Sequence, residues 1–321
     1  MTSASERILL AYLAQPKYGG WVTFTCHLAR GLHAAGYTPV IVKNTKRTEK
    51  QTRDFGRQSR YQNLSTDDLI RLTRDHRVII TAVDKHHHET AARLIETGAT
   101  IVIHDPTELK QPLIDTLDTA QIIVIRESMK LHLPRAEYIP HPYMTRQINP
   151  APSRKPAVAL SRIDFDKHTD MIIEANKQLD TPIAIYGFMN PIYSHFKLDQ
   201  LNPHWKNNYY GTFAADNLWS AVHIASQYDR VIDMSIIKGD GGGTQYTHLE
   251  AANAQTQLIL HSDWKPTGLL AQYAQTCSTA DELAELCSSP AAAHSNRGAD
   301  LLKAHDAKMI ARQYIELLTG S

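Results

Sequence analysis

Short apolar segments alternate with amphipathic segments in the first part of this chain. Residues 8–14, 38–43 and 77–83 are predominantly apolar, and each precedes a stretch with helical spacing of apolar side chains. Strands that are apolar along their whole length are typical of a parallel sheet covered by helices on both faces. Further strands are predicted at 100–105 and 121–127, and helices at 23–36, 65–75, 88–98 and 109–120. The pattern therefore predicts an α/β domain.

The helix ends carry recognisable capping signals. Gly36 follows the first predicted helix and is suited to the left-handed conformation that ends helices. Ser65 precedes a segment that opens with Asp67 and Asp68, which is typical of a helix start. These signals support the predicted boundaries.

Periodicity breaks between Pro134 and Pro156, where prolines crowd a segment with little apolar patterning. The alternation then resumes with strands predicted at 157–162, 181–188, 209–213, 229–235 and 257–262, and helices at 168–179, 215–227, after residue 243 and at 297–318. The predicted organisation is a Rossmann-like domain over 1–140, a proline-rich linker over 141–156, a second Rossmann-like domain over 157–300 and a C-terminal helix over 301–321. Ligands of such proteins bind between the domains, at the carboxyl ends of the strands.

Composition narrows the class of protein. The chain has 321 residues, of which 42% are apolar and 21% charged, as in globular proteins. It contains no run of 18 apolar residues, and its start lacks a basic signal-peptide region. The three cysteines have no metal-ligand spacing. We expect reduced thiols, a cytoplasmic location and a monomer.

The net charge is only +1, but cations gather between residues 43 and 60. Seven basic side chains face two acidic ones in this segment, a local charge of +5: Lys43, Lys46, Arg47, Lys50, Arg53, Arg57 and Arg60. Such a run is usually a solvated loop. It also suits contact with the phosphate backbone of a polyanion. Both interpretations stay open at this point.

The segment that follows residue 238 predicts a nucleotide site. Its glycine run, 239–243, allows backbone N–H groups to approach a ligand, and the helix behind it adds a partial positive charge. Glu250, within the first turns of that helix, offers acceptor oxygens for the hydroxyls of a ribose. The predicted nucleotide-binding residues here are Gly242, Gly243, Gln245, Tyr246, Thr247 and Glu250.

Two strand-to-helix turns add candidate residues. Gly19 and Gly20 precede the first helix and suit close approach of a phosphate or a sugar, although they also fit a plain tight turn. Arg162 and Lys167 follow the first strand of the second domain and can clamp a diphosphate. The alternative is that both are surface cations offset by Asp164 and Asp166.

Arg162, Lys167 and Glu250 behind a glycine-rich turn resemble the retaining GT-B glycosyltransferases. The segment 246–268 is similar, more narrowly, to the DNA α-glucosyltransferases of T-even phages, which modify 5-hydroxymethylcytosine. The resemblance implies a GT-B fold of two Rossmann-like domains that face a central cleft, with the C-terminal helix packing back on the N-terminal domain. It also implies a UDP-sugar donor, with UDP-glucose expected, and double-stranded DNA carrying a hydroxymethylated pyrimidine as acceptor.

The same resemblance implies roles for other residues. Asp105 corresponds to a candidate base and His104 to a contact of the donor sugar, whereas Asp105 followed by Pro106 also fits a helix N-cap. The resemblance also implies that the basic segment 43–60 lies near the bound DNA. Consecutive histidines point in different directions, so His87 is assigned to acceptor contact, and no metal or further cofactor is expected.

The sequence departs from the family at Gln245, where the family often has a second carboxylate, and this leaves the sugar open. The predicted function is transfer of a sugar, with retention, to hydroxymethylpyrimidine in phage DNA. Two alternatives remain: a GT-B enzyme with a small-molecule or glycolipid acceptor, and a nucleotide-sugar binding or epimerase-like protein.

Overall fold

The computed structural model describes residues 6–14, 19–44, 61–149, 151–213, 217–236, 242–291 and 297–320. The chain divides into two compact units. Unit 1 comprises residues 1–144, 215–218 and 304–321, and unit 2 comprises 145–214 and 219–303. Each unit is described by itself.

A parallel sheet of seven strands runs through the described part of unit 1. Its strand order is β3-β2-β1-β4-β5-β6-β7. The chain first adds strands on one side of β1, from β2 to β3, and then adds β4 and the later strands on the other side. The topological switch point, where the direction of strand addition reverses, therefore lies between β1 and β4. The strands are β1 (Arg7–Leu13), β2 (Thr38–Lys43), β3 (Tyr61–Asn63), β4 (Arg77–Val83), β5 (Thr100–Ile103), β6 (Ile122–Val124) and β7 (Glu137–Tyr138).

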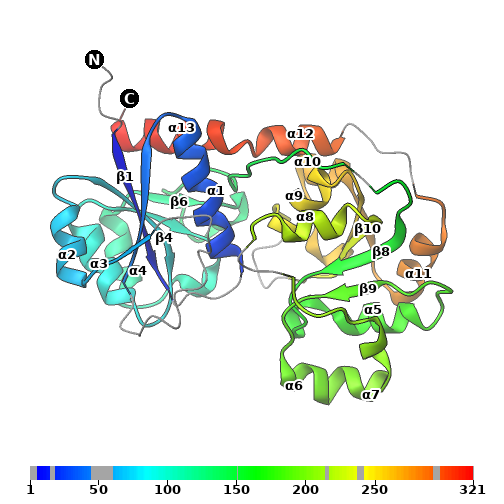
Figure 1. Ribbon diagram of the computed structural model, residues 1–321. Helices are drawn as coiled ribbons and strands as arrows, with labels where there is room; N and C mark the ends of the chain where they lie inside the picture. The colour runs from blue at the N-terminus through cyan, green and yellow to red at the C-terminus, as the bar shows by residue number, and fades with distance from the viewer. Residues whose placement is uncertain are drawn as a thin grey trace. The chain divides into compact units, whose positions relative to one another are not determined.

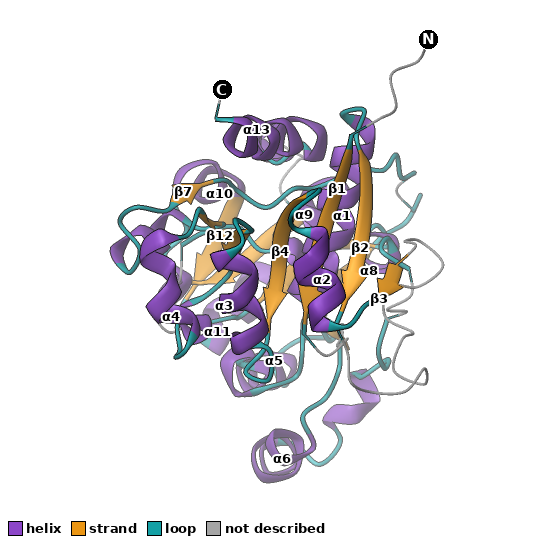
Figure 2. Cartoon of the chain, turned by 90° about the vertical axis from the view of Figure 1, so that its left-hand side faces the viewer, coloured by secondary structure: helices purple, strands orange, loops and turns teal. Residues whose placement is uncertain are grey.

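Helices cover both faces of this sheet. Leu9, Ala11 and Leu13 of β1 belong to one core cluster with Leu69 and Leu94 from helices on one face, and Figure 2 shows α2 and α3 in front of the strands. The intervening residues of β1 are equally buried, as a strand covered on both sides requires. The helices of unit 1 are α1 (Gly20–Ala34), α2 (Thr66–Leu72), α3 (His88–Glu96), α4 (Leu113–Thr116) and α13 (Ala307–Thr319).

The C-terminal helix α13 packs against α1 of unit 1, beside which Figure 1 draws it. A Cβ on Gly31 would lie 2.1 Å from the carbonyl oxygen of Ala307, so only glycine allows this approach. Gln121 donates a hydrogen bond to the carbonyl oxygen of Leu317. The prediction that the C-terminal helix packs on the N-terminal domain is confirmed.

Unit 2 contains a five-stranded parallel sheet in the order β12-β11-β10-β8-β9. After β8 the chain goes out to β9 and then restarts with β10 on the opposite side of β8. The carboxyl ends of β8 and β10 therefore flank the switch point, where ligands bind in open parallel sheets. The strands are β8 (Lys155–Leu160), β9 (Ala184–Tyr186), β10 (Tyr228–Asp233), β11 (Gln257–His261) and β12 (Ala274–Cys277).

Helices again line both faces of this sheet. Ala157 and Ala159 of β8 pack in one cluster with Ile172 and Leu283, which come from α5 and α11. The other face is covered by α8 and α9, which contact β10 and β11. The helices of unit 2 are α5 (Thr169–Asn176), α6 (Pro191–Tyr193), α7 (Asp199–Leu201), α8 (Ser220–Ala225), α9 (Tyr246–Asn253), α10 (Gly268–Tyr273), α11 (Ala280–Ser288) and α12 (Arg297–Ala304).

Several predicted elements differ from the structure. The predicted helix over 109–120 is broken into α4 and 3₁₀ turns. Residues 209–213 form no strand, and Tyr209 makes only an isolated bridge to Ile185. The predicted tail helix is two helices, because His305 and Ala307 exchange backbone hydrogen bonds with Tyr143, and Asp306 caps α13. Pairing with a distant segment thus interrupts a continuous helical pattern.

The cysteines Cys26, Cys277 and Cys287 are free and buried. Burial raises the pKa of Cys277 to about 12 and that of Cys287 to about 11, since a thiolate is disfavoured away from water. No helix within the described ranges is long and apolar enough to cross a membrane.

Candidate functional site

The candidate site of unit 2 forms where β8 and β10 end. The turn after β8 continues into a 3₁₀ helix, η6 (Phe165–Lys167), capped by the Asp164 side chain, which accepts a hydrogen bond from the Phe165 N–H at 2.9 Å. Gly187, just beyond β9, touches this turn so closely that a Cβ there would lie 1.7 Å from the Ser161 carbonyl oxygen. The turn that bears Arg162 and Lys167 is therefore held on two sides.

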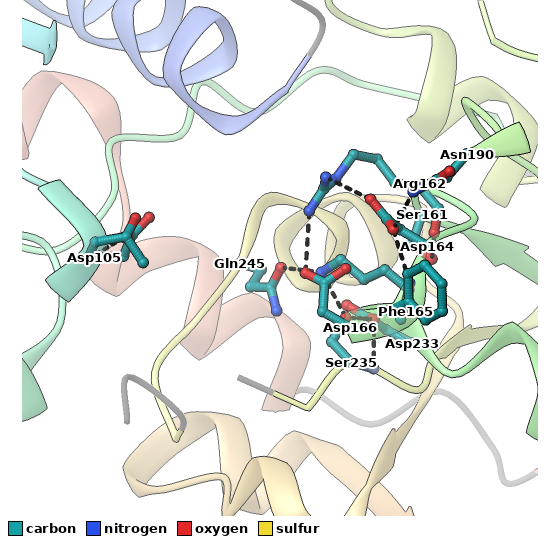
Figure 3. Close-up of polar contacts among 12 residues, drawn as sticks. Asp105, Ser161, Arg162, Asp164, Phe165, Asp166, Asn190, Asp233, Ser235 and Gln245 are labelled. Atoms are coloured by element: carbon teal, nitrogen blue, oxygen red, sulfur yellow. Dashed lines mark hydrogen bonds and ion pairs between the residues drawn. The ribbon is translucent and has the colours of Figure 1, made fainter. Parts of the chain in front are cut away.

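Lys167 lies inside the protein rather than on its surface. Its residue is only 8% exposed. The ammonium donates to the Ser235 hydroxyl at 2.7 Å and to the Gln245 side-chain oxygen at 3.5 Å. Figure 3 labels these two acceptor residues. A buried ammonium is costly unless acceptors surround it, so this position selects for anionic or oxygen-rich partners. It suits a phosphate oxygen.

Asp233, the last residue of β10, is the buried counter-charge of this lysine. Burial by itself raises the pKa of Asp233, but the Lys167 ammonium and the His248 imidazole outweigh that effect and hold the pKa below its ordinary value. The carboxylate accepts hydrogen bonds from the backbone N–H and the hydroxyl of Ser235. The His248 Nε2 lies 3.3 Å from its other oxygen.

The end of the glycine-rich loop is fixed from outside the site. Gly242 has φ 90°, and a Cβ there would lie 2.8 Å from the Lys265 carbonyl oxygen. The Trp264 indole donates to the Gly243 carbonyl oxygen at 2.9 Å, and the Thr267 N–H donates to that of Gly242 at 3.2 Å. Residues 239–241, predicted with them as an anion cradle, lie outside the described residues.

Helix α9 starts at this turn and carries the other predicted donor residues. The Gln245 N–H donates to the His248 Nδ1 at 3.1 Å. The buried Nε2 amide of Gln245 has no hydrogen-bond acceptor within the described ranges. Thr247 donates to the Leu160 carbonyl oxygen, and Tyr246 is 8% exposed. An amide donor left buried in this way is suited to a ligand oxygen.

Arg162 differs from Lys167 although both were predicted as a pair. Its guanidinium is half-exposed and donates to Asp164 at 3.2 Å and to Asp166 at 3.1 Å. The sequence alone left open that both residues are surface cations paired with Asp164 and Asp166. This describes Arg162, whereas Lys167 is buried. A ligand phosphate would compete with the two carboxylates for Arg162.

In unit 1, the predicted glycine turn lies beside the switch point between β1 and β4. Gly19 has φ 149° and precedes α1, and a Cβ on Gly19 or Gly20 would come within 4 Å of no other described residue apart from its chain neighbours. Residues 15–18 lie outside the described residues. A glycine turn at a helix N-terminus is compatible with a ligand.

The His104–Asp105 pair sits at the carboxyl end of β5. Asp105 caps η3 (Pro106–Glu108), accepting a hydrogen bond from the Thr107 N–H at 2.8 Å, as the capping alternative expects. The His104 Nε2 donates to the Thr81 carbonyl oxygen at 2.9 Å, and burial lowers the pKa of this imidazole to about 4. His104 is 6% exposed, a burial similar to that of Lys167 and Glu250.

Glu108 is a buried carboxyl beside the His104–Asp105 pair that the sequence analysis missed. It accepts hydrogen bonds from the Trp21 indole at 3.1 Å and from the His104 N–H at 3.2 Å. Burial, followed by the charge of Asp105, raises its pKa well above the ordinary value. In the sequence, its role could have been suspected only from its position shortly after the His104-Asp105-Pro106 strand end.

Of the predicted DNA contacts, Lys43 and His87 lie within the described residues, and the burial of Lys43 corrects its assignment. Lys43 is fully buried at the end of β2, and a buried ammonium does not reach a phosphate backbone. His87 lies with one ring nitrogen 2.8 Å from Asp84 and the other 2.7 Å from the Asn44 carbonyl oxygen, so protein acceptors already engage both. The other predicted contacts lie outside the described residues: Lys46, Arg47, Lys50, Arg53, Arg57 and Arg60.

Comparison with solved structures identifies the architecture. No family model matches the sequence, and no curated protein matches it significantly. An alpha-glucosyltransferase in complex with UDP is 13% identical with a TM-score of 0.74, and the alignment covers 98% of this chain and 100% of that one. Anabaena HepE in complex with UDP and glucose is 12% identical with a TM-score of 0.72, covering 98% and 99%.

This chain has the GT-B fold. A third structure, TarM of S. aureus in complex with UDP and alpha-GlcNAc-glycerol, is 9% identical with a TM-score of 0.73 and covers 98% and 99% of the two chains. The predictions of an α/β class and of two Rossmann-like sheets are confirmed by the parallel sheets and by these matches. At such low identity the likeness establishes the fold alone.

Within the GT-B fold, the predicted ribose residue Glu250 is a buried carboxyl in α9. It is 9% exposed, and burial raises its pKa to about 7. Hydroxyl donors of a bound ribose would favour the ionised form and offset this cost. No cluster of three metal-ligating side chains occurs within the ranges that the structure describes.

The raised pKa of Glu250 makes stability depend on pH. The folded protein holds the proton more tightly than the unfolded chain, so stability falls as pH rises from the ordinary pKa through about 7. Relative to Glu250→Gln, the wild type is expected to lose about 2 to 3 kcal/mol of unfolding free energy between pH 5 and pH 8. Urea unfolding of both proteins at the two pH values measures this. A pH-independent difference would contradict it.

Proposed function

We propose that this protein is a glycosyltransferase that uses a nucleotide sugar, with UDP-glucose as the first donor to test. The observation that carries the proposal is the buried Lys167 at the switch point of the unit 2 sheet, beside the N-terminus of α9. The described residues proposed to hold the donor are Gly19, Gly20, Arg162, Lys167, Gly242, Gly243, Gln245, Tyr246, Thr247 and Glu250.

The proposed reaction follows from the chemistry of these groups. The bond between the sugar C1 and the diphosphate breaks, and a bond from C1 to an acceptor oxygen forms with retention of configuration. Negative charge grows on the departing UDP. Lys167, Arg162 and the N–H groups at the start of α9 stabilise that charge. The Asp105 carboxylate accepts the acceptor's proton, while the Glu250 carboxylate binds the ribose hydroxyls.

The proposed acceptor is a 5-hydroxymethylpyrimidine in double-stranded DNA, which must leave the base stack to react. The proposal rests on the sequence resemblance and on the basic residues between positions 46 and 60. An alpha-glucosyltransferase of the same fold, 14% identical with a TM-score of 0.71, has been solved with UDP and DNA containing an HMU base. The reaction would take place in the cytoplasm of the host if a phage encodes the protein.

A small-molecule or glycolipid acceptor is the second candidate. The burial of Lys43 and the engagement of His87 favour it, because both were predicted as DNA contacts. Proteins of the same fold include TarM, solved with alpha-GlcNAc-glycerol.

One experiment separates these acceptors. The purified protein is incubated with UDP-glucose and duplex DNA containing 5-hydroxymethylcytosine, 5-hydroxymethyluracil or unmodified cytosine, and the nucleosides are analysed by mass spectrometry. The proposal expects a hexose mass gain on a hydroxymethylated nucleoside only. UDP release without a mass gain on any DNA would overturn the DNA acceptor, and no UDP binding would overturn the donor. A panel of nucleotide sugars identifies the preferred sugar.

Asp105→Asn tests the proposed base separately from the cap. Asparagine caps helices about as well as aspartate, so the unfolding free energy should change by less than about 0.5 kcal/mol. The turnover number should fall about 100-fold or more, because the amide cannot accept the proton. UDP affinity, measured by titration calorimetry, should stay within about twofold. Unchanged turnover would leave Asp105 as a cap alone.

A further inference from the structure

A closed ring of polar contacts surrounds the Lys167 ammonium. Lys167 donates to Ser235 at 2.7 Å, and the Ser235 hydroxyl donates to Asp233. The other Asp233 oxygen lies 3.3 Å from His248, whose Nδ1 accepts the N–H of Gln245 at 3.1 Å. The Gln245 side-chain oxygen accepts from Lys167 at 3.5 Å, which closes the ring. Figure 3 labels Ser235, Asp233 and Gln245 of this ring.

The ring has one consistent arrangement of protons. Because the Gln245 N–H occupies the His248 Nδ1, the ring proton of a neutral imidazole is on Nε2, which faces the Asp233 carboxylate. One carboxylate and one ammonium then balance each other. Asp233 and Ser235 are each 1% exposed and His248 is fully buried, so water does not substitute for these contacts.

The ring joins three pieces of backbone at the switch point of the unit 2 sheet. Lys167 comes from the turn after β8, Asp233 and Ser235 from the end of β10, and Gln245 and His248 from the start of α9. An ammonium has three N–H donors, and hydrogen bonds within the described ranges use two of them. The third is free to meet a phosphate oxygen.

We infer that Asp233, Ser235 and His248 are positioning residues for the donor diphosphate, which they serve through Lys167 without touching the ligand. Asp233 supplies the counter-charge of Lys167, and the Ser235 hydroxyl connects the two side chains by hydrogen bonds. His248 orients Asp233 and belongs to α9, the helix whose N-terminus would bind the same diphosphate. This inference rests on the proposed function and adds residues to which the sequence resemblance assigns no role.

The test measures UDP affinity by titration calorimetry in single and double variants. Ser235→Ala removes the hydroxyl that connects Lys167 to Asp233. Asp233→Asn keeps an acceptor for the Ser235 hydroxyl but removes the negative charge of the carboxylate. Each is expected to weaken UDP binding about tenfold or more, since a hydrogen bond to a charged group is lost or displaced. Ser226→Ala is the control, because Ser226 is also buried and its hydroxyl donates to the His223 carbonyl oxygen, away from the ring. It should leave UDP affinity within about twofold.

A double-mutant cycle separates positioning from general structure. If Ser235 acts only through Lys167, then Ser235→Ala in a Lys167→Met background should weaken binding by less than about twofold further. The same penalty in both backgrounds, or no penalty in either, would overturn the inference. Asp233→Asn repeats the cycle if Ser235→Ala lowers the melting temperature strongly. Failure of the wild type to bind UDP would instead overturn the proposed function, and the inference with it.

Discussion

Gly187→Ala is expected to destabilise unit 2 by about 3 to 5 kcal/mol, through a backbone clash together with unfavourable φ. The added Cβ would lie 1.7 Å from the Ser161 carbonyl oxygen, and Gly187 has φ 153°. No side-chain rotation relieves contact with a backbone atom. The Ile163 N–H donates to the Phe188 carbonyl oxygen beside this contact, so separating the two segments also displaces the turn that bears Lys167.

Tryptophan fluorescence during urea unfolding measures this loss, since Trp205, Trp219 and Trp264 lie in unit 2. Gly211→Ala is the matched control. The Gly211 carbonyl oxygen accepts the Gly187 N–H, and Gly211 has φ 88°, but a Cβ on Gly211 would meet no described residue within 4 Å apart from its chain neighbours. It should cost only about 1 kcal/mol, from the unfavourable backbone conformation. Equal losses in the two variants would show that the close approach is not what makes glycine necessary at 187.

Lys167→Met is expected to weaken UDP binding about 10- to 100-fold and to destabilise the protein by about 3 to 5 kcal/mol. Methionine retains much of the apolar stem but cannot donate to a phosphate. The substitution also leaves Asp233, 1% exposed, as a buried carboxylate without its cation. Both effects therefore come from one ammonium.

The double variant Lys167→Met/Asp233→Asn distinguishes the two effects. Neutralising the stranded carboxylate should recover most of the lost unfolding free energy, measured by urea, whereas UDP binding should stay weak. Recovery of UDP affinity would mean that Lys167 serves the fold and not the ligand. Arg162→Met is a surface comparison: its half-exposed ion pairs should contribute less than about 1 kcal/mol to stability.

The fold was largely predictable because local patterns matched the tertiary arrangement. The strand β2 has the predicted bounds, and Ser65 caps α2 through the Asp68 N–H as predicted. Gly36, just beyond α1, has φ 98° and so takes the predicted left-handed conformation. Apolar runs specify strands that are buried on both faces, and capping residues act within a few positions of themselves.

Elements that depend on distant contacts were not predictable in the same way. The sequence pattern of residues 297–318 is helical throughout, yet the helix is interrupted at His305 and Asp306 because Tyr143 pairs with that segment. The strand predicted at 209–213 is reduced to an isolated bridge between Tyr209 and Ile185, with backbone hydrogen bonds from the Tyr210 N–H to Ile185 and from the Gly187 N–H to Gly211. Neither contact can be predicted from the residues next to it in the sequence.

The sequence by itself determined the α/β class and the strand-to-helix turns that bear Lys167 and Gln245, since these follow from apolar periodicity and from residue types. The tertiary structure alone decided which of the candidate side chains are buried. It placed Lys167 inside a polar ring and Arg162 at the surface, and it enclosed Lys43 and His104. Burial depends on what packs against a residue from elsewhere in the chain, so the charge of a lysine is visible in the sequence, whereas its environment is not.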